Sequence, residues 1–395
     1  MDFAFDDRVR LIRRETRDLL ATADIRAALE RYHRHADVDE DARPLYRMLG
    51  RHGILAVDWA TEYGGRDAGL STAAAVAEEL MAAGVPDTLH VNSIQIVGLF
   101  LLLSGSAEQK SRYLPRLARA EAFAGVLYTE PQAGSDLSGI TTEARRVPGG
   151  YRLSGTKVFS LKSHLVDLTL CAARTGGGTS RYEGITVFIL DMRAPGIRVQ
   201  PLPAISDERF NEVTLDDVFI GDEDVLGRPG EGFALLLRGL TIERTGLDYT
   251  TKARRWYEHA LRALRSTEGE TAATGVRDGL DAGAGRTETG DALVEAGRHG
   301  ADLVKSRLLS WQVISRLGEG RVDEVAAAMA KWYSGELAER IPQWAALEVC
   351  PGTQGDPLAT RVLEAGYRDA PGQTISAGTS EVMLQVVASA RLAAG

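Results

Sequence analysis

The sequence has few cysteines, and its histidines are scattered. Its two cysteines, Cys171 and Cys350, form no CxxC pair, and no HExxH spacing occurs among the histidines. A disulfide framework and a thiolate zinc site are therefore not expected, and no metal site is predicted.

Basic residues are fewer than acidic ones, 46 Lys and Arg against 55 Asp and Glu. The formal net charge is -9 at pH 7. Proteins that bind DNA or RNA need a basic stripe that neutralises phosphates. Nucleic acid is therefore not predicted as a partner.

Long apolar runs are absent from the sequence. The longest, Ile96 to Leu103, is far shorter than the roughly 20 residues that a membrane-spanning helix needs. The first residues include Asp2, Asp6 and Asp7 and no basic segment followed by an apolar run, unlike a secretory signal peptide. We therefore expect no membrane partner and a cytoplasmic location.

Three segments of different character follow one another along the chain. Residues 1–121 carry apolar side chains at helical spacing, residues 122–232 contain short β-prone runs between turns rich in Gly and Pro, and residues 233–395 return to helical patterns. The sequence predicts an N-terminal α-helical domain, a middle β-domain and a C-terminal helical bundle with these bounds.

The sequence also predicts individual strands and helices within the last two domains. The β-prone runs are residues 123–128, 151–153, 166–172, 185–190, 197–202 and 213–220. The helical segments of the last domain are residues 233–266, 292–318, 322–349 and 379–393. Between two of these helices, residues 270–291 are rich in Gly, Thr and Asp, which predicts a flexible inserted loop.

Five motifs occur in a fixed order between residues 62 and 381. They are EYGG at 62–65, GSAEQK at 105–110 with YLP at 113–115, TEPQAGSD at 129–136, GTKVF at 155–159, and YRDA at 367–370 with GTSE at 378–381. Together they resemble the motifs of the acyl-CoA dehydrogenases. The resemblance implies an α+β fold with an N-terminal helical domain, a central β-barrel-like domain and a C-terminal four-helix bundle. It also implies FAD as cofactor and an acyl thioester as substrate.

The same resemblance implies where the flavin binds. Tyr128 and Thr129 match residues that line the edge of the isoalloxazine ring. Ser135 matches a residue that contacts the flavin phosphates or the pantetheine arm of the substrate, and Gly134 allows a close approach of the backbone. Phe159 stands where the family has a tryptophan that covers the flavin. Because Leu161 replaces the family's threonine, the contact to flavin N5 is left to Ser160.

Three further residues match cofactor-binding positions. Thr379 stands where the family has a hydroxyl near the flavin, and Gly352 lies in a shortened form of its adenosine loop. Arg265 matches an arginine that pairs with the flavin pyrophosphate of a neighbouring subunit, which suits a planar guanidinium. The alternative for Arg265 is an ordinary arginine at the end of a helix.

The catalytic base is the most informative departure from the family. Most members have a glutamate directly before the GTSE glycine, where this chain has Ala377. The isovaleryl-CoA dehydrogenases place the base on a helix of the C-terminal domain, directly before an arginine, and Glu243-Arg244 match that pair. Glu243 is therefore predicted to be the base, with a pKa raised by burial. The alternative for Glu243 is an ion pair with a nearby arginine.

Binding of the thioester uses the neighbouring residues. The main-chain N–H of Ala377 is predicted to polarise the thioester carbonyl, a role that survives substitution by alanine because it needs only backbone. Arg244, Gly378 and Ser135 are predicted on the substrate side of the site.

The predicted function is FAD-dependent α,β-dehydrogenation of an acyl thioester. The substrate is carried by CoA or by an acyl carrier protein, and the altered 159–162 and 350–355 segments favour a specialised biosynthetic enzyme. The predicted partners are an electron-transfer flavoprotein as acceptor and further copies of the chain in a homodimer or homotetramer. The alternatives are a flavin-dependent monooxygenase or N-hydroxylase on the same fold and a flavin-free scaffold.

Overall fold

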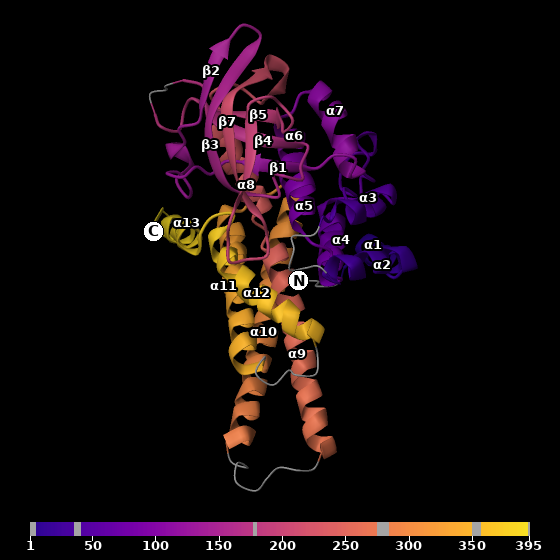
Figure 1. The fold of residues 1–395 in the computed structure, drawn as a ribbon. Coiled ribbons are helices and arrows are strands. Elements are labelled where there is room, and N and C mark those ends of the chain that lie inside the picture. Colours follow the sequence, from indigo (N-terminus) through magenta and orange to yellow (C-terminus); the bar gives the residue numbers. More distant parts are fainter. Residues whose placement is uncertain (1–4, 35–40, 177–179, 275–283, 350–356, 394–395) are drawn as a thin grey trace. The chain divides into compact units, whose positions relative to one another are not determined.

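The computed structural model describes residues 5–34, 41–176, 180–274, 284–349 and 357–393 (Figure 1). They form two compact units, Met1–Glu243 and Arg244–Gly395. The first unit contains helices followed by a sheet, and the second is helical, which confirms the predicted fold class. The three-domain division with its bounds stays a proposal.

The first unit begins with short helices. They are α1 (Asp7–Leu20), α2 (Ala23–Arg34), α3 (Arg43–Arg51), the 3-10 turn η1 (Thr61–Tyr63), α4 (Leu70–Ala82), α5 (Thr88–His90), the π-helical η2 (Val91–Gly98), α6 (Leu99–Ser104) and α7 (Ala107–Ala118). Polar side chains set where some of them start. The carboxylate of Asp6 accepts a hydrogen bond from the Val9 N–H at 2.8 Å, and Ser106 and Gln109 cap α7 reciprocally.

The described residues of the first unit also include eight strands. They are β1 (Ala124–Leu127), β2 (Glu143–Val147), β3 (Gly150–Leu161), β4 (Leu168–Arg174), β5 (Ile185–Asp191), β6 (Ile197–Leu202), β7 (Phe210–Gly221) and β8 (Val225–Leu226), with 3-10 turns η3 (Leu137–Gly139) and η4 (Asp222–Asp224). The sheet has the order β6-β7-β3-β2-β4-β5-β8, and β1 pairs with β4 in parallel.

Burial differs sharply between the strands. Nearly every residue of β4 and β5 is buried, as their continuous apolar runs require, whereas β6 alternates exposed and half-buried residues at the edge of the sheet. All six predicted β-runs coincide with strands. The prediction missed β2 and the two-residue strand β8. The sequence of β2, EARRV, carries three charged residues on a half-exposed ribbon.

Helix α8 (Gly232–Glu243) closes the first unit and packs beside β5 and α6. Glycines allow the close approach. A Cβ added at Gly239 would lie 2.1 Å from the ring of Phe100, and one at Gly232 would lie 2.8 Å from the carbonyl oxygen of Ile185. The position of the end of α8, and so of Glu243, is therefore fixed by packing.

The described residues of the second unit form helices and the short connections between them. The helices are α9 (Leu247–Thr274), α10 (Ala284–Gly318), α11 (Glu324–Trp344), the π-helical η5 (Ala345–Val349), α12 (Pro357–Ile375) and α13 (Ser380–Ala393). Helices α9 to α12 pack on one another as a bundle (Figure 1), and α12 was not among the helical segments predicted for this domain. Alanines such as Ala253, Ala260 and Ala338 are fully buried between them, so the helices approach closely.

Two predictions about the helices need correction. The continuous helix predicted over 233–266 is interrupted after Glu243, because Gly246 has φ +73° and a Cβ there would lie 2.8 Å from the Ala330 carbonyl oxygen. The flexible loop predicted over 270–291 is wrong for 270–274 and 284–291, which continue α9 and α10. Alanine and glutamate near these ends favour helix, which extends from the packed bundle. Residues 275–283 lie outside the described part.

None of the described helices combines the length and the apolarity that crossing a bilayer requires.

Candidate functional site

The TEPQAGSD segment folds as a tight turn at the end of β1. The N–H of Glu130 donates to the carbonyl of Ala133 at 2.9 Å, and the return bond is 3.0 Å long. The backbone of Thr129 accepts from the N–H of Val158 in β3 at 2.9 Å. Thr129 is therefore held by two strands, while the tip that carries Gly134 and Ser135 is exposed.

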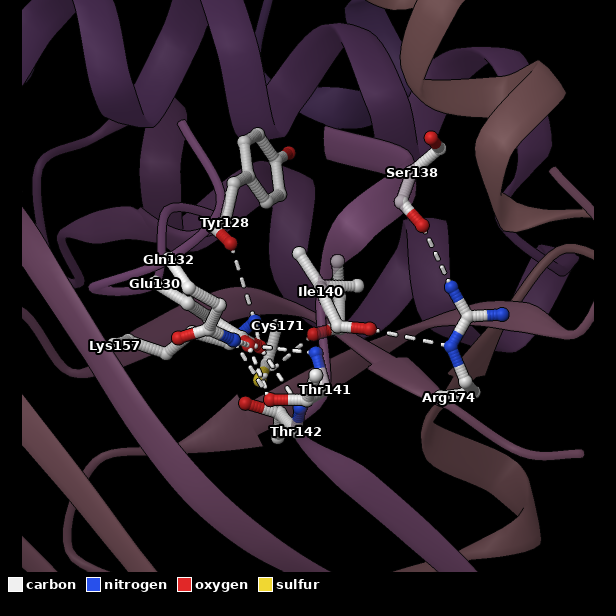
Figure 2. Close-up of polar contacts among 11 residues, drawn as sticks. Tyr128, Glu130, Gln132, Ser138, Ile140, Thr141, Thr142, Lys157, Cys171 and Arg174 are labelled. Atoms are coloured by element: carbon white, nitrogen blue, oxygen red, sulfur yellow. Dashed lines mark hydrogen bonds and ion pairs between the residues drawn. The ribbon is translucent and has the colours of Figure 1, made fainter. Parts of the chain in front are cut away.

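A buried ion pair anchors this turn (Figure 2). The Lys157 ammonium, which is fully buried in β3, donates to Glu130 Oε1 at 2.8 Å and to the Tyr128 carbonyl at 3.1 Å. The Glu130 carboxylate also accepts the backbone N–H groups of Thr141 and Thr142 at 2.6 and 2.9 Å. This carboxylate therefore joins the turn, β3 and the start of β2.

The charge of this anchor is stable over a wide pH range. Burial raises the pKa of Glu130, but the Lys157 charge and the hydrogen bonds outweigh it and hold the pKa at about 2. Downstream, the Arg174 guanidinium donates to the Ile140 carbonyl at 3.2 Å and to the Ser138 carbonyl at 2.8 Å (Figure 2). Both flanks of the exposed tip are thus fixed, whereas the sequence had indicated only the tip.

Gly134 has no steric reason within the chain to be glycine. No atom lies within 4 Å of a Cβ added there, and its φ is not in the left-handed region. If glycine is needed at this position, the need therefore comes from a molecule that approaches the tip.

We expect Gly134→Ala to leave the free energy of unfolding within about 0.5 kcal/mol of the parent, as at an open surface position. Because the added methyl group obstructs the approach of a ligand, we expect the flavin Kd or the substrate KM to rise about 10- to 100-fold. Gly318→Ala, at an equally open position of α10, is the matched control and changes neither constant. Unaltered Kd and KM in Gly134→Ala would show that no ligand contacts this tip.

Phe159 projects from an irregular point of β3. The register of β3 against β7 shifts between Lys157 and Ser160, and Phe159 between them has φ +55°. The residue is 61% exposed, and its ring lies edge-on to the ring of Phe210, with 6.2 Å between the ring centres. A left-handed phenylalanine with an exposed ring is costly in an isolated chain, which points to a role in binding.

The hydroxyl of Ser160 faces the other way. It is buried, donates to the Val126 carbonyl at 2.8 Å and contacts the Ser163 hydroxyl. Because this hydroxyl is committed to the sheet, the structure disfavours the predicted contact between Ser160 and flavin N5.

Tyr128 and Glu243 lie close to each other in the first unit. Burial raises the pKa of Tyr128 well above its ordinary value, and the nearby Glu243 carboxylate raises it further. The ring of Tyr128 also lies 6.4 Å from that of Phe100, on which Gly239 of α8 packs. The contacts among α8, Phe100 and Tyr128 therefore bring the predicted base to the residue that precedes the TEPQAGSD turn.

In the second unit, the predicted substrate residues gather at the turn between α12 and α13. Ala377 and Gly378 are both left-handed, with φ of +55° and +103°. The Arg244 Nε donates to the Ala377 carbonyl at 2.7 Å. Thr379 Oγ1 accepts the N–H of Val382 at 3.3 Å, at the start of α13.

Two buried residues that the sequence had not indicated hold the same turn. The Tyr249 hydroxyl lies 2.9 Å from Ser376 Oγ. The Lys331 ammonium donates to the Gln373 carbonyl at 3.2 Å and lies 5.2 Å from the centre of the Tyr249 ring. Lys331 is fully buried, but only a structure shows this, since the lysine stands in an ordinary helical pattern.

The remaining predicted residues lie elsewhere. Arg265 is exposed on α9, where its charge opposes the rise in the Tyr257 pKa that burial causes. Gly352 lies outside the described residues.

Three family descriptions match the chain in sequence. They are the N-terminal domain of acyl-CoA dehydrogenase at residues 6–121, its middle domain at 125–218 and its C-terminal domain at 230–392.

Curated relatives agree with these matches. Acyl-CoA dehydrogenase FadE29 of Mycobacterium tuberculosis is 29% identical over 89% of this chain and 88% of its own length. Acyl-CoA dehydrogenase FadE34 of the same species is 36% identical over 56% of this chain. The alignments span only 31% of FadE34 and 55% of IpdE1, another relative from that species.

Solved structures share the fold. A glutaryl-coenzyme A dehydrogenase in complex with glutaryl-CoA superposes with a TM-score of 0.83 at 22% identity, over 100% of this chain and 97% of that one. The prolyl acyl carrier protein oxidase AnaB superposes with a TM-score of 0.78 at 21% identity, over 98% and 99% of the two chains.

Proposed function

Because the chain belongs to the acyl-CoA dehydrogenase family, whose members depend on flavin, we propose that it catalyses the FAD-dependent α,β-dehydrogenation of an acyl thioester. The observation that carries this proposal is the position of Glu243. Its carboxylate ends α8 and acts on the buried hydroxyl of Tyr128, directly before the TEPQAGSD turn.

In this proposal Glu243 is the catalytic base. The carboxylate takes the proton of the α-carbon, and its position at the end of a packed helix limits how far it moves. When bound, FAD supplies the acceptor for the hydride that leaves the β-carbon. Ala377, which replaces the family's usual base, has no side chain that could take the proton.

The thioester carbonyl needs a donor as the α-proton leaves. We assign this donor to the main-chain N–H of Ala377, which stabilises the negative charge that develops on the oxygen. Arg244, Tyr249 and Lys331 support this assignment, because they hold the surrounding turn through Ala377, Ser376 and Gln373. Such support keeps a left-handed alanine in one geometry.

The chain's own residues suit a flavin. Tyr128 and Thr129 are held rigidly by the sheet, the space above Gly134 is open, and the Phe159 ring is available for stacking. We propose these residues for FAD together with Ser135, and Thr379, Arg265 and Gly352 as further contacts. We propose that Ser160 supports FAD binding indirectly, because its hydrogen bond to the Val126 carbonyl holds the bulge that carries Phe159.

The substrate carrier and the electron acceptor also belong to the proposal. We propose CoA or an acyl carrier protein as carrier and an electron-transfer flavoprotein as acceptor. We further propose a homo-oligomer, because Val294, Val304 and Leu308 leave an apolar stripe on α10 that is 44% to 60% exposed. Arg265 would then serve the flavin of a neighbouring subunit.

A flavin-dependent oxygenase is the second candidate, because neither Ser160 nor Leu161 offers a free hydroxyl in the bulge. Oxygen distinguishes the two functions. A dehydrogenase, once reduced, is reoxidised slowly by oxygen and fast by an electron-transfer flavoprotein, and an oxygenase shows the opposite order.

The flavin itself is tested first. Purified protein should be yellow, and denaturation should release FAD in one copy per chain. A colourless protein that takes up no added FAD would instead support the flavin-free scaffold.

A further inference from the structure

Tyr128 has a buried hydroxyl that is not explained by the fold. Its residue is 8% exposed, and the hydroxyl has no hydrogen-bond partner among the described residues. The ring points away from the Glu130 and Lys157 cluster in Figure 2, so that network does not satisfy it.

Other buried tyrosines in the described part of the chain do not share this property. Tyr46 donates its hydroxyl to the Pro86 carbonyl, and the Tyr249 hydroxyl lies 2.9 Å from Ser376 Oγ. Buried tyrosine hydroxyls ordinarily find such partners, because an unmade hydrogen bond in a low-dielectric interior is costly. An unpartnered hydroxyl at a candidate site therefore indicates a group that arrives with a ligand.

The hydroxyl acts as a donor. Burial and the neighbouring Glu243 both raise the pKa of Tyr128, so the phenol keeps its proton at any physiological pH. The ligand atom must then be an acceptor. Because the hydroxyl lies near the carboxylate that we assign as base, this acceptor lies near the reacting carbons.

We propose that the Tyr128 hydroxyl donates a hydrogen bond to an oxygen or nitrogen within the acyl group of the substrate, and so selects heteroatom-bearing acyl thioesters over plain hydrocarbon ones. This inference rests on the proposed function. A hydrocarbon chain at this point offers the hydroxyl no acceptor, whereas an oxygen or nitrogen of the acyl group accepts its hydrogen bond. A site that hydrogen-bonds its substrate rejects an analogue that lacks the bonding group.

The test compares wild type with Tyr128→Phe on matched pairs of CoA thioesters. The members of each pair have equal chain length and differ by one oxygen in place of a methylene beyond the β-carbon. We expect wild type to favour the oxygen-bearing member by about 10- to 100-fold in kcat/KM, the range of a buried hydrogen bond. In Tyr128→Phe this preference should disappear, because kcat/KM falls more on the oxygen-bearing member than on the hydrocarbon member.

Two further measurements exclude a structural role. Tyr128→Phe should bind FAD with an unchanged spectrum and melt at or above the wild-type temperature, because it keeps the backbone and the ring of Tyr128 and removes only the hydroxyl. Tyr182→Phe, at an exposed tyrosine of the same unit, is the matched control and keeps the wild-type preference.

Three results would overturn the inference. The first is a wild type with the same kcat/KM on both members of each pair. The second is an equal loss of kcat/KM on both members in Tyr128→Phe, which would assign the hydroxyl to the thioester carbonyl. The third is an altered flavin spectrum in Tyr128→Phe, which would assign the hydroxyl to the cofactor. Failure of the proposed function is distinct, because the bound flavin would then not be bleached by any thioester.

Discussion

The Glu243→Gln enzyme is expected to bind FAD and substrate but to lose about 10²- to 10⁴-fold in kcat, the usual contribution of a general base. Glutamine keeps the size and a hydrogen-bonding oxygen of the side chain but cannot take the α-proton. The measurement is the anaerobic rate at which substrate bleaches the bound flavin, followed by stopped-flow absorbance.

Glu231→Gln provides the control for this substitution. Glu231 is an exposed glutamate directly before α8, and the same change there should leave the bleaching rate unaltered. Normal flavin reduction in Glu243→Gln would contradict the assignment and return Glu243 to the alternative role of an ion-pair partner.

Lys157→Met is expected to lower the free energy of unfolding by about 3–5 kcal/mol, because it leaves the buried Glu130 carboxylate without its cation. Since Glu130 holds the TEPQAGSD turn through Thr141 and Thr142, FAD content should fall in the same variant. Urea unfolding of the flavin-free protein gives the first quantity, and absorbance of the purified protein gives the second.

Two variants check the reason for that loss. In Lys157→Met/Glu130→Gln the uncompensated charge is gone, so about 1–3 kcal/mol of stability should return through the coupling of the two sites. Arg254→Met breaks an exposed ion pair with Glu258 on α9 and should cost no more than about 1 kcal/mol. A Lys157→Met protein as stable as wild type would contradict the claim that the Lys157–Glu130 ion pair stabilises the TEPQAGSD turn.

The sheet could largely be predicted because its strands bury their own apolar runs. Strands β4 (LTLCAAR) and β5 (ITVFILD) coincide with largely apolar segments, which need both faces covered. Strand β2 was missed, because its order comes from pairing with β3 and not from an apolar pattern. Local sequence carries no signal for such a partner.

In the helical unit, the ends of two helices could not be predicted from composition. Gly, Thr and Asp in residues 270–291 indicated a loop, yet α9 reaches Thr274 and α10 begins at Ala284. Helices already nucleated in a packed bundle extend at little cost through residues of moderate propensity. Composition alone does not show this stabilisation by neighbouring helices.

The roles predicted for the residues of the candidate site stay predictions. The structure brings Glu243 close to Tyr128, and Arg244 contacts Ala377. The side chain of Ser160 turned inward because a bulge at Phe159 reverses the alternation of β3. A one-residue irregularity of this kind has no local signature in the sequence.

The burial and the contacts of two lysines also could not be predicted from sequence patterns. Lys157 and Lys331 are fully buried, although lysine is normally exposed. Lys157 donates to the carbonyl of Tyr128, and Lys331 donates to the carbonyl of Gln373. Their roles depend on long-range contacts that only the folded chain defines.

The central claim is tested most directly by anaerobic titration of the FAD-loaded protein with a panel of acyl-CoA and acyl-carrier-protein thioesters. The proposed function predicts that at least one thioester bleaches the flavin, with one equivalent of α,β-unsaturated product per flavin. A flavin that stays oxidised with every thioester, or one that is reduced only by a nicotinamide cofactor, would contradict it.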